Sequence, residues 1–246
     1  MTPNTRLDAF RARPYRNIFV AMVVMIFVNA LAPQMIGGTA ISDFALLIIL
    51  IAALVETVRT TRHIVLALVF GGPAIVARLV AGFRDDSPAW NSTVIVLTAL
   101  FFGFLIWNLL HDLLGERRST GERVYGALCA YLFIGILFSL VFAHMEYRFP
   151  GSFNAGNQAL VEATTSEAAM MPVFTYFSFV TLTTLGYGDI TPVTEHARTL
   201  AWLEALIGQL YLAVMIATLV GLKVSEARTG AGGGPAASRG TDGSSS

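Results

Sequence analysis

The sequence predicts an all-α polytopic membrane protein with six transmembrane helices and one shorter, re-entrant helix. Of its 246 residues, 55% are hydrophobic and 13% are charged, whereas a soluble domain carries about 25% charged residues. The charges cluster between long apolar stretches, and a helix of roughly 20 apolar residues spans a hydrocarbon core about 30 Å thick with its backbone hydrogen bonds satisfied. A long segment between the last two spans also contains an apolar stretch that is too short to cross.

Six stretches have the apolar character of a span: residues 18–35, 44–58, 64–82, 93–110, 124–144 and 197–222. The second is the weakest, because Asp43 and Glu56 bracket only twelve residues. Glu56 and Arg59 must therefore reach the interface by snorkelling. The first competes with an export signal ending at residues 30–32, but the proline at 33 disfavours cleavage and favours a retained helix.

The positions of Arg and Lys predict that both termini are cytoplasmic, because positive residues are retained on that side. Twelve of the sixteen fall on one side: Arg6, Arg11, Arg13, Arg16, Arg59, Arg62, Arg117, Arg118, Arg123, Lys223, Arg228 and Arg239. The opposite face is acidic. The expected organisation is a cytoplasmic N-terminal segment (1–16), a four-helix transmembrane collar (17–110), a cytoplasmic linker (111–123), a pore module (124–224) and a disordered C-terminal tail (225–246).

The composition also excludes several functions. Sixteen basic residues balance sixteen acidic ones, so no positive surplus is available to hold nucleic acid. The single cysteine, Cys129, allows neither an intrachain disulfide nor a cysteine zinc site. The four histidines (His63, His111, His144 and His196) are dispersed, and no cofactor or enzyme site is expected.

The segment between the fifth and sixth spans contains the most informative motif. Residues 172–182 form an apolar stretch that suits a re-entrant helix with Pro172 in its first turn. Thr183-Thr184-Leu185-Gly186-Tyr187-Gly188-Asp189 follows it directly. A chain that points successive carbonyls at one axis needs dihedral angles of alternating sign, which glycine tolerates. Gly186 and Gly188 supply that freedom, and Thr184 offers both a carbonyl and a hydroxyl.

This motif resembles the selectivity filter of the tetrameric potassium channels, Thr-Val-Gly-Tyr-Gly-Asp, and the resemblance extends over the fifth and sixth spans. It implies a bacterial inner-membrane channel that passes potassium through a homotetramer. The partners would then be potassium ions, the lipid bilayer and three further copies of the chain. Potassium ions would bind the carbonyls of the filter residues Thr184, Leu185, Gly186, Tyr187 and Gly188.

Two features of the resemblance concern the residues around the filter. Tyr187 is expected to brace the loop against the short helix, with Asp189 and Tyr176 as further support. Leu185 replaces the more common valine and adds bulk behind the filter. Tyr176 and Phe177 stand where many relatives carry two tryptophans, so the surrounding aromatic cuff is smaller.

The sixth span supplies the expected cavity wall and gate. Gly208 lies mid-helix, where relatives use glycine as a hinge, although glycine also permits close helix packing. Helical periodicity places five residues along one line, which we expect to face the cavity: Gln209, Leu212, Ala213, Ile216 and Val220. Gln209 would then be the polar side chain under the filter, unless it bonds a neighbouring helix instead.

Glu204 is the acidic residue well inside the sixth span, and an ionisable residue there is a functional candidate. It lies about 140° around the helix from the cavity line, which predicts that it faces the short helix or the fifth span. Hydroxyls of Tyr176, Ser178 or Thr181 are its expected partners. Two interpretations remain open, because Glu204 either tunes the filter from behind or only fastens two helices together.

The fourth span, 93–110, contains no arginine, and the third has only Arg78. A voltage sensor needs several charges, because each one moved contributes about 2.3 kcal/mol per 100 mV. We therefore expect little intrinsic voltage dependence and a first half that acts as a collar. The alternatives are a secondary transporter, which would show a second broken helix, and a non-conducting or less selective channel subunit.

Overall fold

The structure is a computed structural model that describes residues 14–36, 64–81, 88–114, 120–156, 158–159 and 167–231. It contains the helices α2 (Pro14–Ile36), α4 (Ile64–Ala81), α5 (Pro88–Leu114), α6 (Thr120–Arg148), α7 (Glu167–Leu182) and α8 (Glu195–Ala231). Three short strands accompany them: β1 (Phe153–Ala155), β2 (Gln158–Ala159) and β3 (Ile190–Pro192). The predicted second span, 44–58, lies outside the described residues.

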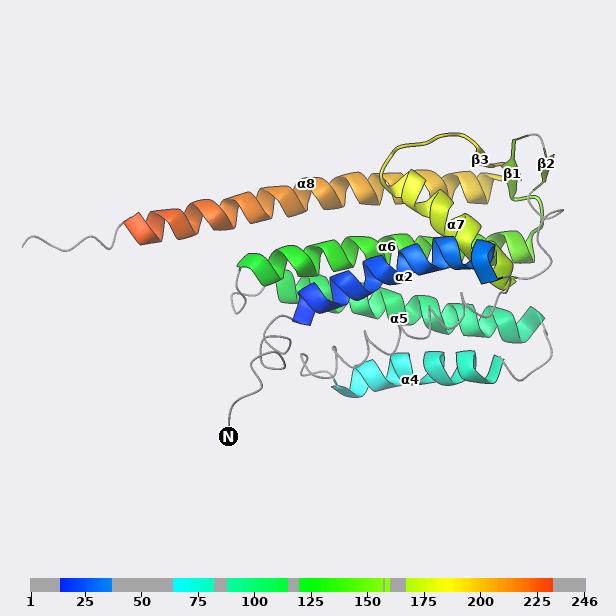
Figure 1. Ribbon diagram of the computed structural model, residues 1–246, viewed down its shortest axis with the longest axis horizontal. Helices are drawn as coiled ribbons and strands as arrows, with labels where there is room; N and C mark the ends of the chain where they lie inside the picture. Colours follow the sequence, from blue (N-terminus) through cyan, green and yellow to red (C-terminus); the bar gives the residue numbers. More distant parts are fainter. Residues whose placement is uncertain are drawn as a thin grey trace, which may run out of the picture.

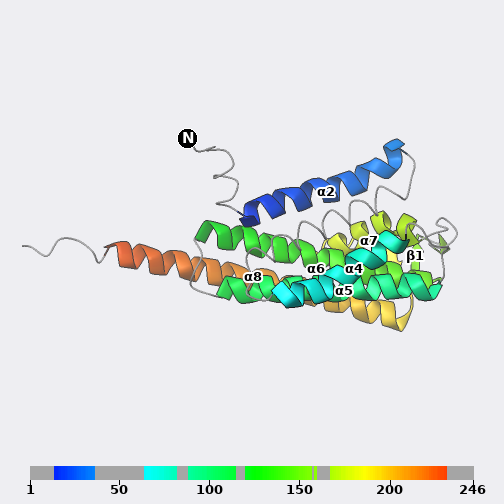
Figure 2. The same cartoon turned by 90° about the horizontal axis from the view of Figure 1, so that it is seen from below.

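The long helices lie side by side around α6, as Figures 1 and 2 show. Helix α6 contacts α2, α5, α7 and α8, while α4 packs on α5. The short helix α7 slants between α6 and α8 at the end that carries the strands, and the last turns of α8 extend beyond the other helices at the opposite end (Figure 1). Helix α6 is therefore the support on which the other described helices are arranged.

Within the part of the chain that the structure describes, three helical segments are long and apolar enough to cross a membrane: Ser92–His111, Gly121–Arg148 and Glu195–Ser225. They coincide with the predicted fourth, fifth and sixth spans. Helices α2 and α4 occupy the predicted first and third spans. The described part of the chain is thus mostly helical, with several apolar helices, as expected for an all-α membrane protein.

Helix α2 is attached to the N-terminal part of α6 by polar and aromatic contacts. The backbone N–H of Tyr15 donates to Glu122 Oε2 over 3.1 Å, which satisfies one of the unpaired amides in the first turn of α2. Cys129 Sγ donates to the carbonyl of Tyr15 over 3.5 Å. The rings of Phe19 and Tyr125 lie 6.0 Å apart between centroids. The first described span is therefore joined directly to the helix that precedes the pore segment.

A three-stranded antiparallel sheet, in the order β2-β1-β3, was not predicted from the sequence. Asn154 of β1 lies opposite Thr191 of β3, so the sheet joins the segment before α7 to the segment after the glycine loop. The buried carboxylate of Glu146 holds the turn that leads into β1, because it accepts N–H bonds of 2.9 Å from both Gly151 and Phe153. These contacts close the loop region at one end of the bundle.

Two predicted boundaries differ from the structure. Helix α7 begins at Glu167, so Pro172 lies inside the helix and not in its first turn. The reason is that residues 168–171, two alanines and two methionines, favour helix, and Met170 and Met171 are buried. Helix α8 continues to Ala231, so residues 225–231 are helical where a disordered tail was expected. Residues 226–228, Glu-Ala-Arg, are strong helix formers.

Candidate functional site

The loop between α7 and β3 has a backbone whose φ angles alternate in sign. Thr184, Gly186 and Gly188 have φ values of 58°, 58° and 78°. Thr184 is the one non-glycine residue with positive φ in the described part of the chain, so Leu185 and Tyr187 have φ of the opposite sign. Such alternation turns successive carbonyls toward the same side of the chain, which is the geometry that a row of cation ligands requires.

The loop is attached to the last turns of α7 through its own amides. The N–H groups of Leu185 and Gly186 both donate to the carbonyl of Val180, over 2.9 and 3.3 Å, and Thr184 N donates to Thr181 O over 2.9 Å. These bonds satisfy carbonyls that the end of a helix leaves without partners. They also hold Thr184, a β-branched residue, in a backbone conformation that it adopts only when its surroundings impose it.

At the α8 side of the loop, Gln209 Nε2 donates to the hydroxyl oxygen of Thr184 over 3.0 Å. The Gln209 side chain therefore bonds the glycine loop, a contact that the sequence did not predict. Leu212 is partly buried, and Ile216 and Val220 are more than half exposed in the single chain. The predicted cavity line is thus largely uncovered within one chain.

At the other end of the loop, Tyr176 and Asp189 form the link to α7. Tyr176 Oη donates to Asp189 Oδ2 over 2.7 Å, and Ile190 N donates to Oδ1 over 3.0 Å. The Tyr176 hydroxyl holds the pKa of the Asp189 carboxyl below its ordinary value, because the bond favours the charged form. Tyr187 is 66% exposed in the single chain, so within one chain Tyr176, and not Tyr187, braces the loop.

Gly208 lies where α8 crosses the C-terminal end of α7. A Cβ atom at this position would overlap the carbonyl oxygen of Leu182 and lie 3.0 Å from Leu182 Cδ1. The same carbonyl accepts a 3.2 Å bond from the Tyr131 hydroxyl of α6. Of the two possibilities left open for Gly208, this contact supports close packing, since only a residue without a side chain lets the two helices approach so closely.

Glu204 is completely buried between α8 and α7. Its carboxyl oxygen Oε1 forms a short hydrogen bond with Ser178 Oγ. The same Ser178 oxygen lies 2.7 Å from the carbonyl oxygen of Gly135 in α6, to which it donates. Ser178 is one of the three hydroxyl partners expected from the sequence, whereas Tyr176 bonds Asp189 instead. Glu204 therefore faces helix α7 and not the exposed side of α8.

An aromatic cluster that the sequence did not predict packs beneath α7. Its members come from α6, β1 and α7: Phe142, Phe153, Phe174 and Phe177. Phe153 lies 4.9 Å from Phe174 and 5.2 Å from Phe177 between ring centroids, with both pairs edge to face. Phe153 follows a polar turn with no periodic pattern around it. Only the fold brings it under the helix that carries the loop.

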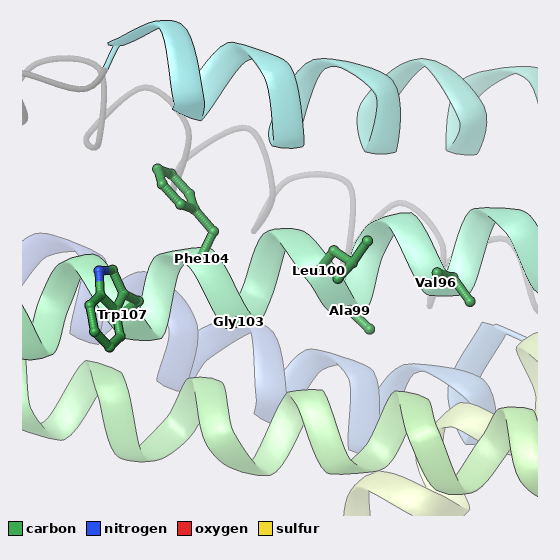
Figure 3. A pocket seen from close by; sticks show the side chains of 6 residues that line it. All are labelled: Val96, Ala99, Leu100, Gly103, Phe104 and Trp107. Carbon is green, nitrogen blue, oxygen red and sulfur yellow. The ribbon is translucent and has the colours of Figure 1, made fainter.

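Elsewhere, the described residues contain no group of three or more His, Cys, Asp or Glu side chains that could hold a metal ion. An apolar groove runs along α5, lined by Val96, Ala99, Leu100, Gly103, Phe104 and Trp107 (Figure 3). It offers no charged group to an ion, and α6 lies between α5 and the glycine loop (Figure 1). This groove is therefore separate from the polar contacts that α7, the loop and α8 make with one another.

Comparison with known proteins places the same region in an ion-channel family. Residues 127–223 match the family model described as "Ion channel". The chain is 29% identical over 109 residues to human potassium voltage-gated channel subfamily A member 7, and 32% identical over 110 residues to mouse subfamily A member 5. Each match covers 44% of this chain but only 21% and 16% of those relatives. The chain thus spans about a fifth of their length or less.

The match covers most of α6, all of α7, the glycine loop and most of α8, which are the elements that build the site. The resemblance noted from the loop motif is thereby supported: over this segment the chain matches an ion-channel family model and is similar to potassium channels.

Proposed function

We propose that the chain forms a potassium-selective channel, in which potassium passes down its gradient through a pore lined by Thr184, Leu185, Gly186, Tyr187 and Gly188. The observation that carries the proposal is the alternating sign of φ along this loop, because it directs carbonyls to one side where they can replace the hydration shell of a cation. Both similar proteins reported above are named potassium channels, which supports the choice of ion.

We further propose that four copies assemble around this loop. One chain has one such loop, and irregular backbone is tolerated at membrane depth only when it is buried in protein or lines a water-filled path. Large apolar side chains along α8 are exposed in the single chain, among them Leu210, Val214 and Val220 at 57%, 64% and 57%. Neighbouring copies and lipid would cover this surface.

In this proposal the surrounding residues have distinct roles. Tyr176 and Asp189 support the outer end of the filter, and Glu204 supports it from behind. The cavity and gate are formed by Gln209, Leu212, Ile216 and Val220, and Gly208 provides the close crossing of α8 with α7. The segment organisation is the one expected from the sequence, with six spans, both termini in the cytoplasm of a bacterial cell and a collar at residues 17–110.

The test is ion flux from the purified full chain in liposomes, with potassium, sodium and rubidium compared. We expect potassium and rubidium flux to exceed sodium flux by at least a factor of ten. Equal sodium and potassium permeability would reject selectivity, and a native mass of a dimer or trimer would reject the proposed assembly.

A matched pair of variants makes the test specific to the loop. Gly186→Ala should abolish flux, because positive φ costs a residue with a Cβ about 1–2 kcal/mol even though space is open around it. Gly103→Ala, in an equally open position without positive φ, should conduct as the wild type does. If both variants conduct normally, the carbonyl row is not the conducting path.

A further inference from the structure

The Ser178 hydroxyl lies between two oxygen atoms of different helices. Its oxygen is 2.7 Å from the carbonyl oxygen of Gly135 in α6 and in short contact with Glu204 Oε1 in α8. All three groups are inside the protein, with Ser178 and Glu204 at 0% exposure. Ser178 therefore joins α6, α7 and α8 at one point, two residues before the Val180 carbonyl that holds the loop.

The number of hydrogens at this point restricts the protonation state. A serine hydroxyl has one hydrogen to donate, and a backbone carbonyl can only accept. If Glu204 were ionised, both neighbours of Ser178 would be pure acceptors, and one contact would bring two oxygen atoms together without a hydrogen between them. If Glu204 carries a proton, it can donate to Ser178, which in turn donates to Gly135, and both contacts are then hydrogen bonds.

The charges around Glu204 lead to the same state. Its second carboxyl oxygen, Oε2, is buried and has no hydrogen-bond partner. The titratable group of α6 that interacts electrostatically with it is the phenol of Tyr131, and α7 contributes Ser178. No basic side chain among the described residues pairs with Glu204. A buried carboxylate without a cation or a full set of donors is strongly disfavoured, so the neutral acid fits this site.

We propose that Glu204 is a positioning residue that acts as a neutral hydrogen-bond donor. The two hydrogen bonds that run from Glu204 through Ser178 to the Gly135 carbonyl then hold the pore helix α7 against α6 and α8. The expected effect on conduction rests on the proposed function, whereas the claim that the Glu204 carboxyl is protonated does not. The amides of the filter loop bond carbonyls at the end of α7. Loss of the Glu204 proton would break the bond that fixes α7, so the position of the loop would become less well defined. Potassium flux should then fall as the pH is raised.

Infrared spectroscopy of the full chain in lipid tests the proton directly, without any need for conduction. We expect the C=O stretching band of a protonated carboxylic acid at neutral pH, and its loss in Glu204→Gln. Glu195→Gln is the matched control, because Glu195 is exposed in the first turn of the same helix; it should retain the band. Absence of a band that depends on Glu204 would overturn the proposal.

Ser178→Ala provides the second measurement, and it keeps the test decisive if Glu204→Gln does not assemble. Removing the acceptor should move the Glu204 band to the frequency of a carboxyl without a hydrogen-bond acceptor. A band at the wild-type position would show that Glu204 does not donate to Ser178, and the proposed pair of hydrogen bonds would then be wrong.

The pH profile of flux separates positioning from a merely structural role. Wild-type flux should decline at alkaline pH, whereas Glu204→Gln, which keeps an N–H donor but cannot ionise, should retain its flux there. The same alkaline decline in both proteins would refute the effect on conduction. If the wild type does not conduct at all, the proposed function fails, while the infrared result still decides whether Glu204 is protonated.

Discussion

At the scale of single residues, a hydrogen bond between two exposed side chains joins the β3 end of the glycine loop to α7. Tyr176 donates to Asp189 across 2.7 Å, and this bond is the main reason that the pKa of Asp189 lies below its ordinary value. A lowered carboxyl pKa means that the bond favours the ionised form. Its contribution is present above the ordinary pKa of an aspartate and is lost as the pH falls through the lowered value.

Replacement of Tyr176 by phenylalanine should therefore make the proposed potassium flux more sensitive to acid. Without the hydroxyl, the pKa of Asp189 returns toward its ordinary value, so the carboxylate is neutralised at a higher pH. We expect the midpoint of acid inhibition of potassium flux in liposomes to move to higher pH. Tyr211→Phe is the control, because that hydroxyl bonds Ala127 in α6 and is not a partner of Asp189. An unchanged midpoint in Tyr176→Phe would contradict the assignment.

At the scale of the elements, helix α7 is held by three different kinds of contact. The aromatic cluster packs α7 on α6 and β1, and Ser178 bonds α7 to α6 and α8. The absence of a side chain at Gly208 lets the Leu182 carbonyl, at the C-terminal end of α7, approach α8. The crossing at Gly208 is the most restrictive of the three, because the obstructing atom belongs to the backbone and cannot move away by rotation of a side chain.

A comparison of two glycines in α8 tests this crossing. Gly208→Ala should destabilise the assembled protein by about 1–3 kcal/mol, the range expected for an overpacked site. Gly221→Ala adds the same methyl group where nothing lies within 4 Å, and it should leave stability unchanged or raise it by roughly 0.5–1 kcal/mol, since alanine favours helix. Thermal unfolding in detergent measures both. Equal melting temperatures for the two variants would rule out a tight crossing.

At the scale of the whole molecule, the helices that precede the pore segment carry few charges. Helix α5 contains no arginine or lysine, and its basic residue near the end is His111. The curated relatives are named voltage-gated channels, but the matches cover about a fifth of their length or less. The word "voltage-gated" in those names therefore gives no information about the first half of this chain.

We expect conductance to change little with voltage between about −100 and +100 mV in symmetrical potassium, because a charge must move through the field to make opening voltage-dependent. Planar-bilayer recordings of the purified protein measure this directly. Recordings in sodium-free and magnesium-free solutions serve as the control for block by another ion. An open probability that rises several-fold per 25 mV in those solutions would contradict the expectation.

The amino-acid sequence was sufficient to predict the described helices, the similarity to potassium channels and the alternating backbone of the glycine loop. The length of an apolar stretch predicts a membrane span, because the thickness of the bilayer sets the number of residues that a spanning helix needs. Gly186 and Gly188 predict the backbone conformation of the loop, because that conformation depends on only five neighbouring residues. The helix ends were predicted less well at Glu167 and Ala231, because helix propensity and packing extended α7 and α8 beyond the segments that polarity and proline had marked.

Only the tertiary structure decided which side chains support the loop. Ser178 bonds Gly135 and Glu204, which are 43 and 26 residues away in the sequence. Phe153 packs under α7 from a strand that the periodicity of the sequence did not predict. Likewise, Glu146 holds the turn before β1 through two backbone amides. Sequence periodicity shows which face of a helix is apolar, but the angle and register at which α6, α7 and α8 cross determine which atoms touch.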